Sequence, residues 1–132
     1  MKRFEIHVIP HEEQRYNTIG DWVMGEPHQL YVSDLGNPDA EFLVILHEMV
    51  ELWLCHKAGI PQTPVDAWDL TWEPSWDNQH DPGCDRKAPY HEAHEAGEVI
   101  ERVMCPYLMD WHEYERALEA LNPRNEAEPN GS

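Results

Sequence analysis

The side chains with the clearest chemical potential lie in one short stretch, His47-Glu48-Met49-Val50-Glu51. Residues four apart share one face of an α-helix, so the spacing directs His47 and Glu51 at one point and leaves Glu48 to one side. An imidazole and a carboxylate are ligands of divalent metals, and a second carboxylate can accept a proton from a water molecule on the metal. We interpret His47 and Glu51 as metal ligands and Glu48 as the catalytic base.

The residues around this motif are almost all apolar. They are Phe42, Leu43, Val44, Ile45, Leu46, Met49, Val50, Leu52, Trp53 and Leu54. Ionised groups in such surroundings are costly unless they are paired or bind a metal. The chain has nine Lys and Arg against 26 Asp and Glu, so cations that could neutralise buried acids are scarce. The alternative to a metal site is a structural network in which a buried histidine pairs with acids that also bond Arg or backbone groups.

A catalytic zinc ion typically has three protein ligands, so a third is needed. The segment after Pro89 predicts a helix with several candidates, which are His91, His94, Glu98 and Glu101. On a projection of about 100° per residue, apolar side chains define the buried side of this helix and the candidates spread over the other side. The apolar residues are Ala93, Ala96, Val99, Ile100 and Val103.

The choice between the two histidines depends on their neighbours. Ala93 and Gly97 are small and lie close to His94, so another helix could approach closely there, which favours His94 over His91. Glu101, two turns further on, could be an additional ligand or could orient one. Glu98 and His91 remain less favoured ligands.

The helix that carries the motif has clear end signals. Asn37 is a good N-cap, Pro38 follows where its missing N–H costs nothing, and Gly59 is a typical stop. We therefore expect a helix from Pro38 to about Ala58. Because its apolar residues lie on nearly every side, the helix should be central to the fold.

The other elements are shorter. Alternating patterns predict three strands, at residues 4–9, about 16–24 and 29–33. Two further helices are expected, from 90 to about 105 and from 111 to about 121, whereas the Pro- and Trp-rich residues 60–89 predict a long irregular segment.

These elements predict one α+β domain over residues 1–123. In it, a small N-terminal antiparallel sheet packs on the buried active-site helix, and two further helices close the other side. Residues 124–132 are expected to form a flexible C-terminal tail.

The charge of the chain, 9 − 26 = −17, excludes roles that depend on neutralising phosphate. We therefore expect no nucleic-acid partner and no anionic membrane surface. The mostly apolar stretch 42–55 is too short to span a bilayer, and the N-terminus lacks the apolar run of a signal peptide. We interpret the three cysteines as reduced thiols, which are typical of the cytoplasm, so a cytoplasmic protein is expected.

An extended segment from Leu30 to Ser33, then a helix bearing His-Glu with a ligand one turn on, then a later helix with a third ligand, resembles the zincin-like metallopeptidases. From about Ser33 to Tyr114 the chain also resembles a group of small, uncharacterised phage and prophage proteins. The resemblance implies His47 as the first ligand, Glu48 as the base, Glu51 as the second ligand and His94 as the third.

One position departs from the zincin pattern. The usual motif is HExxH, and here its last position is Glu51. Two histidines and one glutamate still form a ligand set that supports peptidase chemistry. The extra carboxylate makes the metal less electron-poor, so Zn²⁺ is expected with Fe²⁺ or Mn²⁺ as alternatives.

The function predicted from the sequence is a metal-dependent hydrolase that acts on a peptide or protein. An edge strand near Tyr31 would align the extended substrate. A rival hypothesis is an acidic interaction or inhibitor protein that mimics nucleic acid and occupies a basic surface of a partner protein, with a structural metal site or none. A third hypothesis is a metal-binding scaffold protein that catalyses no reaction.

Overall fold

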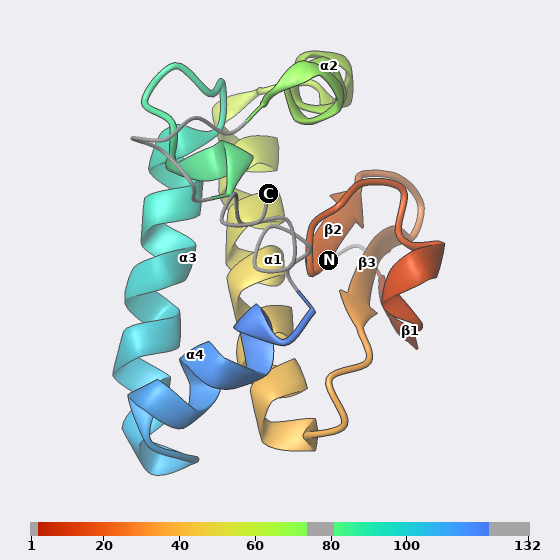
Figure 1. Cartoon of the computed structure of the whole chain (residues 1–132). Helices are drawn as coiled ribbons and strands as arrows, with labels where there is room; N and C mark the ends of the chain where they lie inside the picture. The colour runs from red at the N-terminus through yellow and green to blue at the C-terminus, as the bar shows by residue number, and fades with distance from the viewer. Residues whose placement is uncertain (1–2, 74–80, 122–132) are drawn as a thin grey trace.

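One long helix, α1 (Pro38–Ala58), lies at the centre of the fold, between a small sheet and a second long helix (Figure 1). In this computed structural model residues 3–73 and 81–121 are described. The Asn37 side chain caps α1 by accepting hydrogen bonds from the backbone N–H groups of Asp39 and Ala40, each at 3.1 Å. Gly59 ends the helix in the left-handed region, at φ 75°. The predicted bounds and both end signals of this helix are confirmed.

The sheet contains β1 (Phe4–Ile9), β2 (Gly20–Val23) and β3 (His28–Ser33), in the order β1-β3-β2. β3 pairs antiparallel with β2 and parallel with β1. The sheet is therefore mixed and not antiparallel as expected, because β3 inserts between two strands that precede it in sequence. Tyr31 lies in the central strand, so the expectation of an edge strand there is wrong, and the edges are β1 and β2.

Within residues 3–73 and 81–121, three α-helices accompany α1, one more than expected. They are α2 (Gln62–Thr71), α3 (His91–Met104) and α4 (Trp111–Glu119). α2 lies within the segment 60–89 that was expected to be irregular. Its Pro64 falls in the first helical turn, where the missing N–H removes no intrahelical bond, so the proline does not exclude a helix. None of the helices in the described residues is long and apolar enough to cross a bilayer.

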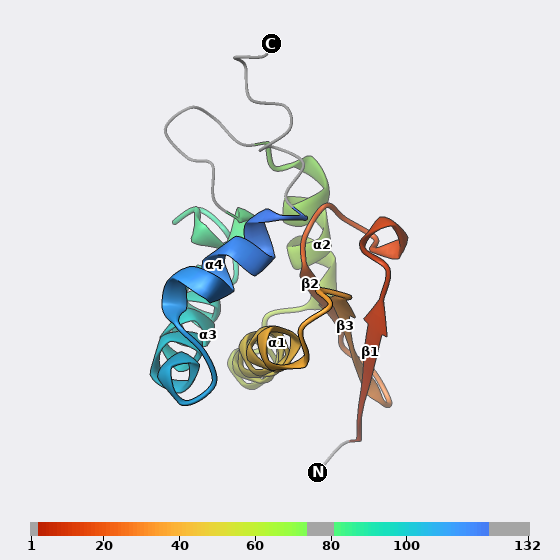
Figure 2. The same ribbon diagram turned by 60° about the horizontal axis from the view of Figure 1, so that its bottom comes forward.

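Short 3₁₀ turns complete the chain path, at η1 (His11–Glu13), η2 (Pro82–Cys84) and η3 (Cys105–Tyr107). The Asp110 side chain caps α4 by accepting from the backbone N–H of His112 at 2.9 Å. Figure 2 shows α1 and α3 side by side, with α2 and α4 on one side of the pair. The tail expected at residues 124–132 lies outside the described residues.

The apolar core divides into two clusters along α1. Ala40, Leu43 and Val44 belong to one cluster, and Leu52 and Cys55 belong to the other. The buried polar residues of α1 lie between these two groups in sequence, at positions 47, 48 and 51. The fold therefore holds a polar layer between two apolar ones.

α3 completes this layer by turning a polar side inward. Its buried residues are Ala93, His94, Gly97 and Glu101. Val99 and Val103, which were expected on the buried side, are 58% and 57% exposed. That expectation is wrong because the surface of α1 that α3 meets is itself polar, so Glu101 and His94 of α3 find partners there.

Candidate metal centre

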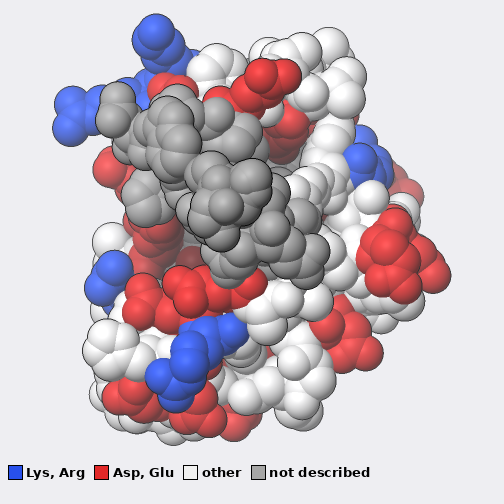
Figure 3. All heavy atoms as spheres, viewed as in Figure 1, with Lys and Arg blue, Asp and Glu red and all other residues white. Residues whose placement is uncertain are grey.

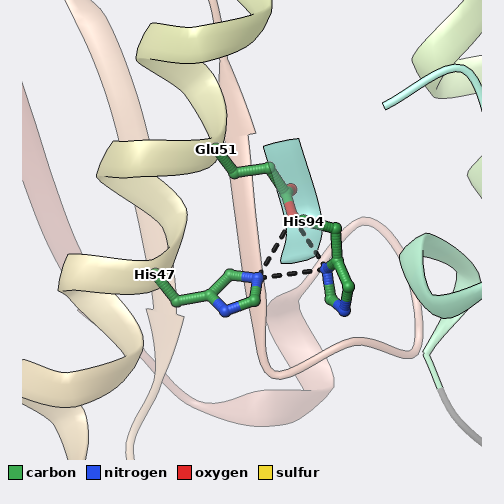
Figure 4. Close-up of side chains that lie close together, drawn as sticks. All are labelled: His47, Glu51 and His94. Atoms are coloured by element: carbon green, nitrogen blue, oxygen red, sulfur yellow. Dashed lines mark hydrogen bonds and ion pairs between the residues drawn. The ribbon is translucent and has the colours of Figure 1, made fainter. Parts of the chain in front are cut away.

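Three side chains from two helices converge on one point in this polar layer. His47 and Glu51 extend from α1 and His94 extends from α3 (Figure 4). His47 Nε2 lies 3.1 Å from Glu51 Oε2 and 3.1 Å from His94 Nδ1, and His94 Nδ1 lies 2.8 Å from Glu51 Oε2. All three residues are buried. The structure thus brings together the two predicted ligands of α1 and the histidine favoured as the third.

The spacing of these atoms suits a tetrahedral metal ion. Zinc bonds of about 2.0–2.2 Å to nitrogen and oxygen place two ligand atoms of a tetrahedron about 3.3 Å apart. The observed separations of 2.8–3.1 Å are slightly shorter, so small side-chain shifts would admit the ion. The three residues therefore fit one face of a tetrahedral zinc site.

The partner of the other ring nitrogen fixes the tautomer of His47. Its Nδ1–H donates to Glu101 Oε1, which leaves the Nε2 lone pair pointing at the centre of the cluster. The Tyr114 hydroxyl donates to the other oxygen of Glu101. Tyr114 is fully buried. Glu101, expected either as a ligand or as an orienting residue, contacts the outer nitrogen of His47 and takes the orienting position.

The outer atoms of Glu51 and His94 are held in a similar way. The Trp22 indole N–H donates to Glu51 Oε1 at 2.8 Å, which leaves Oε2 free to face the two histidines. The outer nitrogen of His94, Nε2, lies 3.6 Å from Glu98 Oε2 and 3.4 Å from Cys84 Sγ. When Nε2 donates to these groups, the lone pair of Nδ1 points at the same centre as the other two.

Three lone pairs that face one point repel one another unless a positive charge lies between them. In the metal-free cluster, protons on the two histidines supply this positive charge. Burial opposes protonation of His47, but hydrogen bonds with Glu101 and Glu51 outweigh it and raise the pKa of His47 well above its ordinary value. Burial likewise opposes protonation of His94, but hydrogen bonds with Cys84, Glu51 and Glu98 raise its pKa. A metal ion can take the place of such a proton.

Glu51 is the negatively charged partner of the two protonated histidines. Burial favours its neutral form, but hydrogen bonds from His47 and His94 outweigh burial and lower the pKa of Glu51 to about 2. Glu51 is therefore ionised and available as a ligand at any pH at which the histidines can be deprotonated.

Glu48 lies beside the cluster, and its pKa is shifted in the opposite direction from that of Glu51. Burial, with the nearby charge of Glu51, raises the pKa of Glu48 well above its ordinary value. An ideal Cβ at Gly20 would lie 2.5 Å from the Glu48 carboxylate, so β2 passes directly against this side chain. A carboxyl group with a raised pKa, next to a metal site, has the properties required of a general base.

The close approach of α1 and α3 depends on a glycine. An ideal Cβ at Gly97 would lie 3.0 Å from the ring and the backbone oxygen of His47. A larger residue would push His47 away from His94. The prediction that small residues let another helix approach here agrees with this contact.

A cleft of about 510 Å³ opens onto the cluster. Its floor includes His47, Glu48, Glu51 and His94, and the edge strand β2 contributes Gly20 to one wall. Among the described residues that line the cleft, nine are acidic and Arg102 is the one Lys or Arg. Acidic side chains are also spread over the outer surface, as Figure 3 shows for one face. The cleft therefore carries a negative field that attracts cations.

A second group of potential ligands shares His94. Cys84, His94 and Glu98 have ligand atoms close together around the outer nitrogen of His94. Neutral His94 has one lone pair, so it can serve this group or the buried one, but not both. Glu98 is half-exposed, whereas all residues of the first group are buried, so the first group excludes water better.

His91 lies apart from both groups. Its Nδ1–H donates to the Gly83 carbonyl at 2.9 Å, and its Nε2 lies 3.3 Å from Glu95. The structure therefore places His94, and not His91, beside the ligands of α1. Sequence reasoning missed Trp22 and Tyr114, because an indole on a strand and a phenol on the last helix carry no spacing signal that links them to the motif.

Comparison with protein-family models, with curated proteins and with solved structures finds no match to this chain.

Proposed function

We propose that this chain binds one divalent metal ion through His47, Glu51 and His94, with zinc preferred over iron or manganese. With this metal the protein would hydrolyse amide bonds, and Glu48 would be the general base. The convergence of three buried lone pairs, each fixed by a partner on the outer atom of its side chain, carries the proposal. Such oriented ligands are typical of metal sites in proteins. Bound there, the metal would polarise a carbonyl and make water more acidic.

The side chains around the metal would have two further roles, proton transfer and orientation of the ligands. Glu48 would accept the proton of the attacking water and deliver it to the leaving amine, a role that its raised pKa supports. Trp22, Glu101 and Tyr114 would keep the ligands in place, so that little reorganisation accompanies reaction.

The substrate would be an extended peptide, preferably with basic side chains. β2 is an edge strand that lies against Glu48, so a peptide paired along this edge would bring its carbonyl groups close to the base. The excess of acidic side chains in the cleft favours Lys or Arg in the substrate. β2 thus takes the aligning role that was expected near Tyr31.

Metal analysis of protein purified without chelators and without nickel resin tests the first step. We expect about one equivalent of metal, its loss in His47→Ala, and its retention in the matched control His91→Ala. Protein with only traces of any transition metal would refute the site, and retention of metal by His47→Ala would refute the ligand assignment.

Hydrolysis is tested separately with a library of fluorogenic peptides that contain Lys or Arg. Glu48→Gln should keep the metal and lose the cleavage of any peptide that the wild type cleaves. A Glu48→Gln variant that cleaves at the wild-type rate would exclude this residue as the base while leaving the metal site in place.

A further inference from the structure

A row of apolar side chains on α1 does not line the cleft and lies outside both cores. Phe42, Leu46, Val50 and Leu54 recur every four residues, and Phe42 and Leu54 are 43% and 37% exposed. Among the described residues, none of the four belongs to or packs against either apolar cluster of the core. At about 100° per residue, Leu46 and Val50 lie on average roughly 100° around α1 from the ligands His47 and Glu51.

Leu46 and Val50 are half-buried, and Leu54 lines a second cavity with Tyr90 and Ala93 at the start of α3. In Figure 2, α2 and α4 lie on one side of the α1–α3 pair, and the opposite side of the pair is open. Partly exposed apolar rows of this kind on a helix are typical of interfaces with another helix. We call the face formed by Phe42, Leu46, Val50 and Leu54 the α1 back face.

The order of residues on the α1 back face is symmetric about position 48. Leu46 and Val50 lie two residues to either side of this position, and Phe42 and Leu54 lie six residues to either side. If α1 of a second copy packs antiparallel across a two-fold axis at this level, Leu46 meets Val50 at the centre, and Phe42 and Leu54, about 60° to either side of the midline, flank this contact. The face is therefore complementary to itself in size and chemistry.

Charged residues at the two ends of α1 follow the same symmetry. Asp39 and Lys57 lie nine residues to either side of position 48, and both are exposed. Their separation of eighteen residues is five helical turns, so they lie on one line along the helix. In the antiparallel arrangement each Asp39 meets Lys57 of the second copy, whereas a parallel arrangement would place like charges together.

We propose that this protein forms a two-fold symmetric homodimer in which the α1 back faces pack antiparallel. Leu46 and Val50 lie at the centre of this interface, and two Asp39–Lys57 ion pairs close its ends. None of the four residues of the α1 back face lines the cleft, so packing of this face leaves the cleft residues of both copies uncovered. The dimer does not require the metal, so metal-free and zinc-loaded protein should associate alike.

Sedimentation equilibrium of the full chain over micromolar to near-millimolar concentrations tests the proposal, with circular dichroism to verify folding of each variant. The expected species has twice the 15.5 kDa mass of the chain. Leu46→Glu should weaken dimerisation by about 100-fold or more, since it places charges at the centre of the interface. Leu70→Glu is the matched control, because Leu70 is 73% exposed on α2.

Charge reversal tests the antiparallel register. Asp39→Lys changes the net charge to −17 + 2 = −15, and Lys57→Asp changes it to −17 − 2 = −19. General repulsion between acidic chains predicts that the first variant associates more tightly and the second less tightly. The proposed pairing predicts that both weaken association by about tenfold, and that the double variant Asp39→Lys/Lys57→Asp restores it.

Glu12→Lys is the matched charge control, since it gives the same net charge as Asp39→Lys from an exposed position on η1. It should leave the dimer unchanged or slightly tighter. A wild type that stays monomeric throughout the concentration range, or a dimer that tolerates Leu46→Glu, would overturn the assignment of this face. A double variant that associates as weakly as the single variants would overturn the antiparallel register.

Discussion

Glu101→Gln is the substitution that most directly separates an oriented metal site from a simple ion-pair network. Glu101 accepts the Nδ1–H of His47 on one oxygen and the Tyr114 hydroxyl on the other. A glutamine side chain has nearly the same shape, but it has one acceptor oxygen and no charge, so one of the two donors loses its partner. His47 would then be a weaker and less well oriented ligand.

The size of the effect follows from the position of Glu101 behind a ligand. Loss of an orienting partner typically lowers metal affinity by about 10–100-fold, which corresponds to about 1.4–2.7 kcal/mol. Zinc affinity is measured by competition with a chromophoric chelator, and the visible spectrum of the cobalt-substituted protein reports the coordination geometry. We expect weaker binding with a tetrahedral cobalt spectrum retained, because the three ligands themselves are unchanged.

The matched control is Glu95→Gln, which removes an exposed acid on the same helix and changes the net charge equally. It should leave zinc affinity within about twofold of the wild type. Equal losses in the two variants would mean that general charge, and not orientation of His47, determines affinity. Unchanged zinc binding in Glu101→Gln would refute the orienting role.

Three further predictions concern the surroundings of the site. Gly20→Ala should reduce hydrolysis more than zinc binding, because its Cβ would lie 2.5 Å from the Glu48 carboxylate; metal loss as the main effect would contradict this. Tyr114→Phe should lower the free energy of unfolding by about 1.5–3 kcal/mol in urea titrations, and an unchanged midpoint would show that its hydroxyl contributes nothing. The metal-free protein should lose thermal stability as pH rises from about 5 to 8. The raised pKa of Glu48 opposes its ionisation in the fold, and above pH 6.5 the unfolded chain gives up histidine protons that His47 and His94 retain in the fold because their pKa values are raised. The stabilisation by added zinc should grow over the same range, since zinc displaces protons, and a metal-free melting temperature that rises with pH would contradict the assigned shifts.

The elements predicted correctly from the sequence are those whose signals are local. Asn37, Pro38 and Gly59 define the ends of α1 because capping and helix termination depend on neighbouring residues. The direction of β1 in the sheet depends instead on pairing with β3, whose residues lie 24 positions further along the chain, and no local pattern encodes this pairing. α2 was missed because prolines near its start resemble the composition of a loop.

In the candidate site too, local contacts could be predicted from the sequence and contacts between distant residues could not. The convergence of His47 and Glu51 follows from their spacing of four residues on one helix. The position of His94 opposite them required the additional clue of Gly97, whose lack of a side chain lets the helices approach. The contact of Trp22 with Glu51 joins a strand to a helix across the fold, so only the tertiary structure reveals it.

The largest error, the orientation of α3, has a physical cause that connects the site to the proposed dimer. Hydrophobic periodicity assumes that the interior of a protein is apolar, so it assigned Val99 and Val103 to the buried side. When the interior contains a polar layer, the charged side of a neighbouring helix gains partners by turning inward and its apolar side is left in contact with solvent. The same polar layer occupies part of the surface of α1, and Leu46 and Val50 lie beside it, outside both apolar clusters. The exposed apolar residues of α3 are thus a consequence of burying acids and histidines, and association with a second copy would shield the partly exposed apolar face of α1 from water.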